Sequence, residues 1–333
     1  MTSPKSVRTC FSITYLLNYI RSSTNNYWKV SNSIIVIGSS NTDMVIKADH
    51  LPAPGETILG GTFLMNAGGK GANQAVAASR LGGLVTFIAK TGNDIFGKRA
   101  LELFNEEGLE TSFIISDPVN PSGVALITVD KNAENCIVVA SGANAALDPK
   151  DLYNAESTIE QAGIILLQLE IPVATIEYIV MLAAKNNIRI VLNPAPARTL
   201  SNDLLKHVSI ITPNETEACM LTDVRVVDDD TAEKAARILH AKGISTVIIT
   251  LGERGALLLH QGIVSRVNSP KVTAVDTTAA GDVFNGALVV ALSKNKNMLE
   301  AVQFACQAAA ICVTRMGAQS SAPYLHEMQN TWV

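Results

Sequence analysis

Short apolar runs alternate with longer helical stretches from Ile34 onward, and this alternation restricts the possible fold more than any other feature. Six mainly apolar runs are typical of parallel strands buried on both faces, and they span residues 34–37, 86–89, 164–169, 188–192, 208–212 and 246–251. Helical patterns occupy residues 72–81, 175–187, 214–221, 231–242 and 299–315. This spacing of βαβ units predicts an α/β fold with a doubly wound, mainly parallel sheet flanked by helices.

Two segments, at about residues 42–65 and 121–141, interrupt that alternation. The second contains a hairpin pattern, with strands at 124–129 and 136–140 around Asp130-Lys131-Asn132. The first contains the strong turn signal Pro52-Ala53-Pro54-Gly55. We expect both segments to form a small antiparallel β lid over one edge of the main sheet. Because strand edges and apolar lid faces need cover, we also expect a homodimer through the lid.

The charge and cysteine content exclude several classes of protein. The chain has 26 basic and 30 acidic residues, a formal net charge of -4 and no long basic run, so it lacks the electrostatic signature of nucleic-acid binding. Its cysteines are odd in number, widely spaced and without a Cys-x-x-Cys pair, which argues against a disulfide framework or a zinc knuckle. They are Cys10, Cys136, Cys219, Cys306 and Cys312. A reducing compartment fits best.

Residues 1–30 differ in composition from the rest, with several basic and hydroxyl residues and no acid before Asp43. The apolar stretch at residues 10–20 is interrupted by polar residues and is shorter than the roughly 20 residues that a membrane span needs. An organelle transit peptide is compatible with this composition. We favour a disordered extension or an upstream start codon, a domain at 31–333, a cytoplasmic location and no membrane partner.

Polar residues follow the predicted strands at the points where ligands bind in open parallel sheets. Glu170 and Asn193 each come directly after an apolar run, and so do the segments 38–43 and 213–217. Any one of them is more often a helix cap or a turn residue than a functional group. Their shared placement favours a site at this edge of the sheet.

The most informative segment runs from Asp276 to Ala287, where a turn of small residues opens an apolar helix. The amides of Ala279, Ala280 and Gly281 lie where a helix leaves donors unpaired, which predicts an anion hole. Asp282 would repel a phosphate there unless it takes a proton from an attacking hydroxyl. On this segment alone, a helix cap and a catalytic base are equally good interpretations of Asp282. The phosphate-loop and dinucleotide-binding glycine patterns are absent.

Two further glycine-rich segments carry alternatives of their own. Residues 66–78 open a helix with Gly68-Gly69-Lys70-Gly71, which allows either backbone approach to a polyhydroxylated ligand or close helix-to-sheet packing. Residues 250–255 follow a strand directly and suit either a nucleotide cradle or a tight strand-to-strand turn.

Taken as an ordered set, four motifs resemble those of the ribokinase-like carbohydrate kinase family. They are Gly38-x-x-Asn41-x-Asp43, Gly68-Gly69-Lys70-Gly71-Ala72-Asn73, Asn214-x-x-Glu217 and Asp276-Thr277-x-x-Ala280-Gly281-Asp282. The resemblance covers the chain from about Ile34 to the end. It implies transfer of the ATP γ-phosphoryl group to O5 of D-ribose, giving D-ribose 5-phosphate and ADP, with Asp282 as base.

The resemblance also implies roles for individual residues. The sugar would be held by Asn41, Thr42, Asp43, Gly69, Lys70, Gly71, Ala72, Asn73, Glu170 and Asp282. The nucleotide would be bordered by Asn214, Thr250, Leu251, Gly252, Glu253, Arg254, Gly255, Gly281, Asp282 and Cys306. Asn214 and Glu217 would organise Mg²⁺ and the phosphates. An activating K⁺ ion would lie near Asp276, Thr278, Cys312, Arg315, Gly317 and Ser321.

Three alternatives stay open from the sequence. A kinase of the same family acting on 2-deoxyribose, a hexose or a nucleoside would share the Asp276–Asp282 segment. A non-catalytic sugar or nucleotide sensor could share the fold, although an intact Asp282 argues against it. A nicotinamide-dependent oxidoreductase is disfavoured because no dinucleotide fingerprint follows the first strand.

Overall fold

A nine-stranded sheet forms the centre of the molecule in the computed structural model, which describes residues 31–132 and 134–328. The strand order is β13-β12-β11-β10-β9-β8-β1-β4-β5. In chain order these strands are β1 (Ser33–Ile37), β4 (Leu84–Gly92), β5 (Ile114–Asp117), β8 (Ile164–Leu167), β9 (Arg189–Leu192), β10 (Ile210–Ile211), β11 (Thr246–Thr250), β12 (Ala256–His260) and β13 (Ile263–Val267). All neighbours pair in parallel except β11 with β12 and β12 with β13. The predicted fold class is therefore confirmed, while the predicted extension at residues 1–30 lies outside the described residues.

Helices cover both faces of this sheet, as strands that are apolar on both faces require. Strand β1 shows the division, because Ile34 and Val36 pack into one buried cluster and Ile35 and Ile37 into the other. The first cluster lies against α2 (Lys70–Arg80), α3 (Ile95–Glu106), α9 (Ala280–Ser293) and α10 (Met298–Cys312). The second lies against α4 (Glu156–Ile159), α5 (Val173–Lys185), α6 (Asn202–Leu205), α7 (Glu215–Thr222) and α8 (Asp229–Ala241). Burial of each large apolar side chain contributes about 1.5–3 kcal/mol.

Several elements were not predicted from the sequence. Strands β12 and β13 extend the sheet with antiparallel pairing, and the turn between β11 and β12 is the short helix η3 (Gly252–Arg254). The strand expected at residues 208–212 shortens to Ile210–Ile211. Short helices η1 (Gly142–Ala146), η2 (Pro149–Ala155), η4 (Gln319–Ser321) and α11 (Leu325–Met328) complete the structure.

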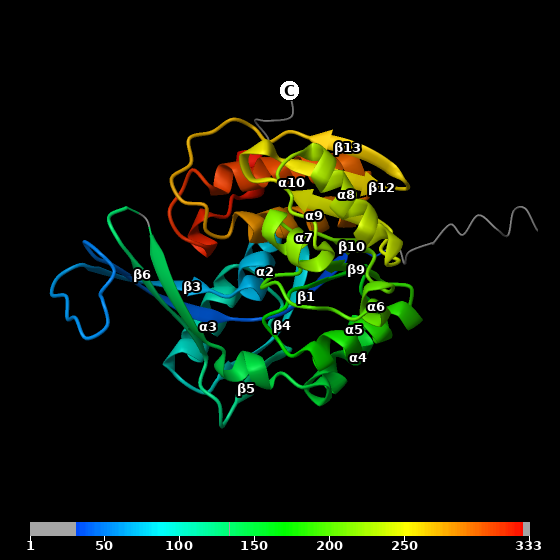
Figure 1. Ribbon diagram of the computed structural model, residues 1–333. Helices are drawn as coiled ribbons and strands as arrows, with labels where there is room; N and C mark the ends of the chain where they lie inside the picture. The colour runs from blue at the N-terminus through cyan, green and yellow to red at the C-terminus, as the bar shows by residue number, and fades with distance from the viewer. Residues whose placement is uncertain (1–30, 133, 329–333) are drawn as a thin grey trace, which may run out of the picture.

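A second sheet of four strands projects from one side of the main body (Figure 1). Its order is β3-β2-β6-β7, formed by β2 (Asn41–Lys47), β3 (Thr62–Gly68), β6 (Gly123–Val129) and β7 (Asn135–Ala140). The expected antiparallel pairing holds within each hairpin, β2 with β3 and β6 with β7. The central pair β2 and β6 is parallel instead, so the lid is a mixed sheet. The reason is that both strands leave the main sheet in the same direction.

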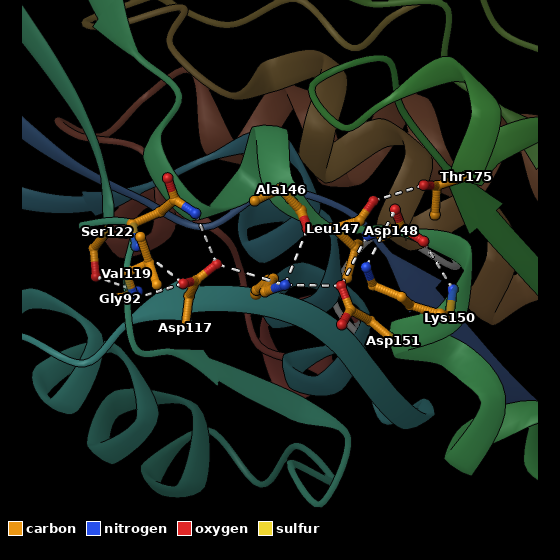
Figure 2. Close-up of polar contacts among 12 residues, drawn as sticks. Gly92, Asp117, Val119, Ser122, Ala146, Leu147, Asp148, Lys150, Asp151 and Thr175 are labelled. Carbon is orange, nitrogen blue, oxygen red and sulfur yellow. Dashed lines mark hydrogen bonds and ion pairs between the residues drawn. The ribbon is translucent and has the colours of Figure 1, made fainter.

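The second lid hairpin is joined to the main sheet through Lys90 of β4, and Figure 2 labels its neighbours Asp117, Ala146 and Asp151. The Lys90 ammonium group donates to Asp151 at 2.8 Å and to the carbonyl of Ala146 at 3.0 Å, and it lies 3.5 Å from Asp117. Asp117 precedes β6, whereas Ala146 and Asp151 follow β7. One partly buried cation therefore ties both ends of this hairpin to the central sheet.

Among the described residues, none of the helices combines the length and apolar composition that crossing a membrane requires.

Candidate active site

Four carboxylates and one ammonium group gather where the lid meets the main sheet. Lys70 opens α2, and its charge interacts with Asp282, Glu170, Glu217 and Asp43. Burial lowers the pKa of Lys70, but these four carboxylates raise it above its ordinary value. Lys70 therefore stays protonated at neutral pH. The sequence predicted each of these five residues as part of a site, and the structure brings them together from β2, α2, α7, α9 and the turn after β8.

Asp282 lies in the first turn of α9, but its carboxylate does not cap the helix. The N-cap position belongs to Ala279 in a left-handed conformation, and no side chain caps this end. The Asp282 Oδ2 atom accepts a hydrogen bond from Asn73 at 3.0 Å, and Oδ1 accepts one from Gln74 at 2.9 Å. The helix-cap alternative is thus wrong in this structure. Burial raises the pKa of Asp282, while Lys70, Asn73 and Gln74 oppose the rise.

The start of α2 is packed against the strand-to-lid connection at residues 38–41. Gly69 is its N-cap, with φ at 89°, and a Cβ on Gly71 would lie 2.5 Å from the backbone nitrogen of Ser39. Glu170 approaches the same turn, where its Oε2 atom accepts from the Ser39 hydroxyl and from the Lys70 amide at 3.0 Å. The close-packing alternative raised for this glycine-rich segment is therefore confirmed, while the approach of a ligand to its backbone stays a prediction.

Asp43 stands on β2, on the lid side of the carboxylate group. Burial, followed by the charges of Glu170 and Asp282, raises the pKa of Asp43 to about 6. Within the described ranges, no hydrogen bond joins the Asp43 carboxylate to another group, so its oxygens are available to hydroxyl donors. Gly68 makes this position possible, because a Cβ there would lie 2.1 Å from Asp43 Oδ2.

Asn41, at the base of the lid, has a fixed amide orientation. Its Oδ1 atom accepts a hydrogen bond of 2.8 Å from Asn144, and Asn144 also bonds both backbone groups of Ser40. Because the oxygen is taken, the Asn41 amide group presents its N–H donors to any ligand. Thr42 follows on the opposite face of β2, since side chains alternate along a strand.

Asn214 and Glu217 form a reciprocal capping box at the start of α7. The Asn214 side chain accepts from the Glu217 amide at 2.8 Å, and Glu217 Oε2 accepts from the Asn214 amide at 2.9 Å. Burial raises the pKa of Glu217, against the lowering effect of the Asn214 amide and Lys70. The motif therefore has a structural role, and it also holds a carboxylate toward Lys70 and Asp282.

A cavity of about 870 Å³ lies beside the start of α9. Its lining includes most residues predicted to border a nucleotide, namely Asn214, Thr250, Gly252, Glu253, Arg254, Gly255, Gly281 and Cys306. Leu251 is 2% exposed and does not line it. Burial raises the pKa of the Cys306 thiol to about 12, so this side chain is neutral in the cavity wall. The lining also includes the apolar residues Val272, Ala274 and Phe284, which suit a planar aromatic ring.

The predicted anion hole opens onto this cavity. Ala280 and Gly281 both line it, and a Cβ added to Gly281 would meet no atom within 4 Å. The Ala280 amide donates to the carbonyl of Thr277 at 3.3 Å, so it is partly engaged. The following amides, of Gly281 and Asp282, are first-turn donors that a helix does not pair internally. The geometry suits an anion that enters from the cavity.

The residues predicted around a monovalent cation form one connected loop cluster. Asp276 accepts from the amides of Thr278 and Gly317, each at 2.9 Å. Partial burial raises the Asp276 pKa, but the hydrogen bonds from Thr278 and Gly317 bring it below its ordinary value. Cys312 and Ser321 are buried and adjacent, with Sγ and Oγ 3.0 Å apart, and the Arg315 side chain turns away to Glu327. A charged Asp276 in this loop cluster is compatible with a cation nearby.

Sequence reasoning missed two residues that shape the site, Asn144 and Gln168, and it named Ser39 only as part of the segment 38–43. Ser39 and Asn144 position Glu170 and Asn41, as described above, and Gln168 contacts Gln74 behind Asp282. The signal for Gln168 was present, since it is a polar residue inside the apolar run Ile164–Leu169. A buried amide in such a run needs a hydrogen-bond partner, which points to a second polar group in the core.

Comparison with known proteins gives consistent results. A family profile described as pfkB family carbohydrate kinase matches residues 31–325. Ribokinase of Haemophilus influenzae is 47% identical over 295 residues, covering 89% of this chain and 96% of that protein. Deoxyribokinase of Salmonella typhi is 37% identical over 295 residues, covering 88% and 96%. The structure of Arabidopsis thaliana ribokinase complexed with ribose and ATP matches with a TM-score of 0.85 at 31% identity, covering 90% of this chain and 98% of that one.

Proposed function

The chain belongs to the pfkB family of carbohydrate kinases, and on that premise we propose that it transfers the γ-phosphoryl group of ATP to O5 of D-ribose. The observation that carries this proposal is the position of Asp282, a buried carboxylate that is bonded to Asn73 and Gln74 and directly follows Gly281 in the cavity wall. The cavity suits a nucleotide, and the charged side chains around Lys70 suit the hydroxyls of a sugar.

In the proposed mechanism, sugar and nucleotide meet at Asp282. Asn41 donates to the sugar, Asp43 and Glu170 accept from its hydroxyls, and Lys70 and Asn73 lie beside them. Asp282 accepts the proton of the attacking hydroxyl, and the amides of Ala279 to Asp282 stabilise the charge on the transferring group. The apolar residues that line the cavity, Val272, Ala274 and Phe284, receive the adenine ring of ATP. The lid excludes water when a sugar occupies the pocket.

The charges of the site support a requirement for cations. Four carboxylates surround one ammonium group, so an ATP phosphate entering here meets a net negative field. Glu217 and Asn214 would hold Mg²⁺, which shields the phosphate charge when bound. The loop around Asp276 would hold K⁺ and thereby order the amides of the anion hole before phosphate arrives. The oxygen-rich donor set of both places fits these hard cations.

The lid also supports the proposal of a homodimer. Strand alternation puts Phe63, Met65, Ile46, Leu126 and Val138 on the face opposite Asp43, and these side chains are 45–62% exposed. A contiguous apolar face of this kind is typical of a protein interface. Sedimentation velocity should find a dimer, and Leu126→Glu combined with Val138→Glu should shift it to a monomer.

A specific observation also favours a second substrate. A deoxyribokinase matches over the same length of 295 residues as a ribokinase, at 37% identity against 47%, so 2-deoxyribose is the leading alternative acceptor. A coupled assay of ADP release with ribose, 2-deoxyribose, hexoses and nucleosides, with and without K⁺, separates these substrates. We expect the highest kcat/KM with ribose and K⁺. Higher kcat/KM with 2-deoxyribose would replace the proposed substrate, and release of no ADP with any acceptor would reject the kinase assignment.

A further inference from the structure

Behind Asp282, away from the nucleotide cavity, a chain of buried amides runs from α2 to the end of β8. Gln74 is fully buried, and its Nε2 group donates both to Asp282 Oδ1 at 2.9 Å and to Asn193 Oδ1 at 3.0 Å. Its Oε1 atom accepts a hydrogen bond of 2.6 Å from Nε2 of Gln168, which is also fully buried. Neither glutamine belongs to the sugar pocket or to the nucleotide cavity.

We propose that Gln74, oriented by Gln168, is the positioning residue that fixes the carboxylate of Asp282 for proton transfer. This inference rests on the proposed role of Asp282 as base. Gln74 touches neither substrate in the proposed mechanism, so it acts only through Asp282.

The direction of the amide is the first argument. If the Gln74 amide were reversed, its oxygen would face two other acceptors, Asp282 Oδ1 and Asn193 Oδ1, and its nitrogen would face the donor Nε2 of Gln168. Each of those pairings is repulsive. Gln168 therefore supports the orientation in which Gln74 donates to the base, and a carboxylate held by a fixed donor keeps one rotation about its Cβ–Cγ bond.

The second argument is the difference between the two donors to Asp282. Asn73 donates to Oδ2, but its own Oδ1 atom is buried without a partner among the described residues, so only one end of its amide is held, whereas both ends of the Gln74 amide are hydrogen-bonded. Asn73 also lies in the proposed sugar pocket, where its contacts change as substrates come and go. Gln74 is held from behind, and it therefore supplies the anchor that is present in every state.

The third argument is energetic. Gln168 Oε1 is buried and has no hydrogen-bond partner within the described part of the chain. Leaving such an acceptor unpaired lowers the stability of the folded protein. The Gln168 oxygen also requires glycine at position 38, since a Cβ there would lie 2.0 Å from it. Apolar side chains of similar volume would stabilise this part of the core better, so stability alone does not account for the two glutamines.

The test is a double-mutant cycle between Gln74→Met and Asp282→Asn, with kcat, both KM values and the thermal midpoint measured for each protein. We expect Gln74→Met to lower kcat by about tenfold, because a misplaced catalytic group loses roughly this much or more, with both KM values changed by less than about twofold. In the Asp282→Asn background, the same change should have no further effect on residual turnover.

The pH dependence provides a readout that a purely structural role would not move. Loss of the Gln74 donor removes a bond to the charged form, so the acidic limb of kcat should shift to higher pH. The charged groups around Asp282, which are Lys70, Glu170, Asp43 and Glu217, are unchanged in this variant. Gln168→Met should also lower kcat and shift the acidic limb of kcat to higher pH, both by smaller amounts. This variant serves as the test if Gln74→Met does not fold.

Thr175→Val is the matched control, because it also removes a buried hydrogen bond, from Thr175 to the carbonyl of Leu147, in a helix remote from Asp282. It should lower the thermal midpoint and leave kcat and its pH profile unchanged. Normal kcat in Gln74→Met and Gln168→Met, or an equal fall in the Asp282→Asn background, would overturn the inference. If the Gln74 inference failed but the wild type were active and Asp282→Asn impaired, the proposed function would still stand. If Asp282→Asn were not impaired, Asp282 would not be the base.

Discussion

Two glycines occupy the same position in two helices of the site, yet their surroundings differ completely. Gly71 and Gly281 are each the second residue of a helix, α2 and α9 respectively. A Cβ on Gly71 would lie 2.5 Å from the Ser39 nitrogen and 2.6 Å from the Gly38 carbonyl carbon. A Cβ on Gly281 would meet nothing within 4 Å, and it would point into the nucleotide cavity.

The difference shows that a glycine-rich helix start has two distinct physical uses. At α2, the absence of a side chain lets two backbones touch, and the polar groups that face the ligand are side chains. At α9, the absence of a side chain leaves open space beside the first-turn backbone amides, which suits the proposed anion. Sequence alone treats the two segments alike.

The strongest way to break this comparison is to add the same methyl group at each glycine. Gly71→Ala should lower the free energy of unfolding by about 3 kcal/mol or more, because backbone atoms cannot move aside as a flexible side chain can. Urea unfolding followed by circular dichroism measures this loss. A Gly71→Ala protein with wild-type stability would show that the contact with residues 38 and 39 relaxes freely.

Gly281→Ala is the matched change, and we expect the reverse pattern. Its stability should stay unchanged or rise by up to about 1 kcal/mol, since alanine is the better helix former. Its kcat/KM for ATP should fall by about tenfold or more, because the methyl group enters the space in front of the anion hole. Steady-state kinetics with varied ATP checks this. A large loss of stability without a loss of kcat/KM would contradict the assignment of open ligand space.

A smaller effect sharpens the α2 side of the comparison, where charged side chains carry the function. Asp43 has a pKa raised to about 6 in the folded protein, so its charged form is disfavoured by folding. Asp43→Asn should therefore stabilise the protein, by at most about 3 kcal/mol for a shift of this size. The gain is absent below the ordinary pKa of aspartate near 4 and complete well above pH 6.

Thermal midpoints measured between pH 4 and pH 8 test the Asp43 prediction. The same variant should have a lower kcat/KM for the sugar. Its profile of kcat/KM against pH should also lack the fall near pH 6 that protonation of Asp43 causes. Equal thermal midpoints for wild type and Asp43→Asn at pH 8 would show that folding does not disfavour the charged form of the Asp43 carboxylate.

The sequence predicted the main sheet well because strands buried on both faces leave continuous apolar runs, such as Ile34–Ile37 and Thr246–Leu251. It did not predict the antiparallel strands β12 and β13, which continue the sheet. The turn that leads into them, residues 250–255, could equally be interpreted as a nucleotide-binding loop. The parallel pairing of β2 with β6 was also missed, because pairing direction depends on where distant strands leave the main sheet.

For the site, residues in ordered motifs were the predictable part. Asp43, Lys70, Glu170, Glu217 and Asp282 were named from the sequence, and the structure brings them together. Gln168 and Asn144 were not named, because each acts by contact with a residue more than 90 positions away in the chain. Such contacts leave no local pattern. The sequence also could not decide whether Asp282 is a helix cap or a base, since only its hydrogen bonds distinguish the two.

The most direct measurement of the central claim is sugar-dependent ADP release by wild type and by Asp282→Asn at saturating ATP, ribose, Mg²⁺ and K⁺. We predict that the variant keeps the wild-type thermal midpoint within a few degrees and binds ATP, while kcat falls on the order of 10² or more. Near-normal turnover by the folded variant would contradict the account, because the carboxylate between the sugar pocket and the anion hole would then have no part in the chemistry.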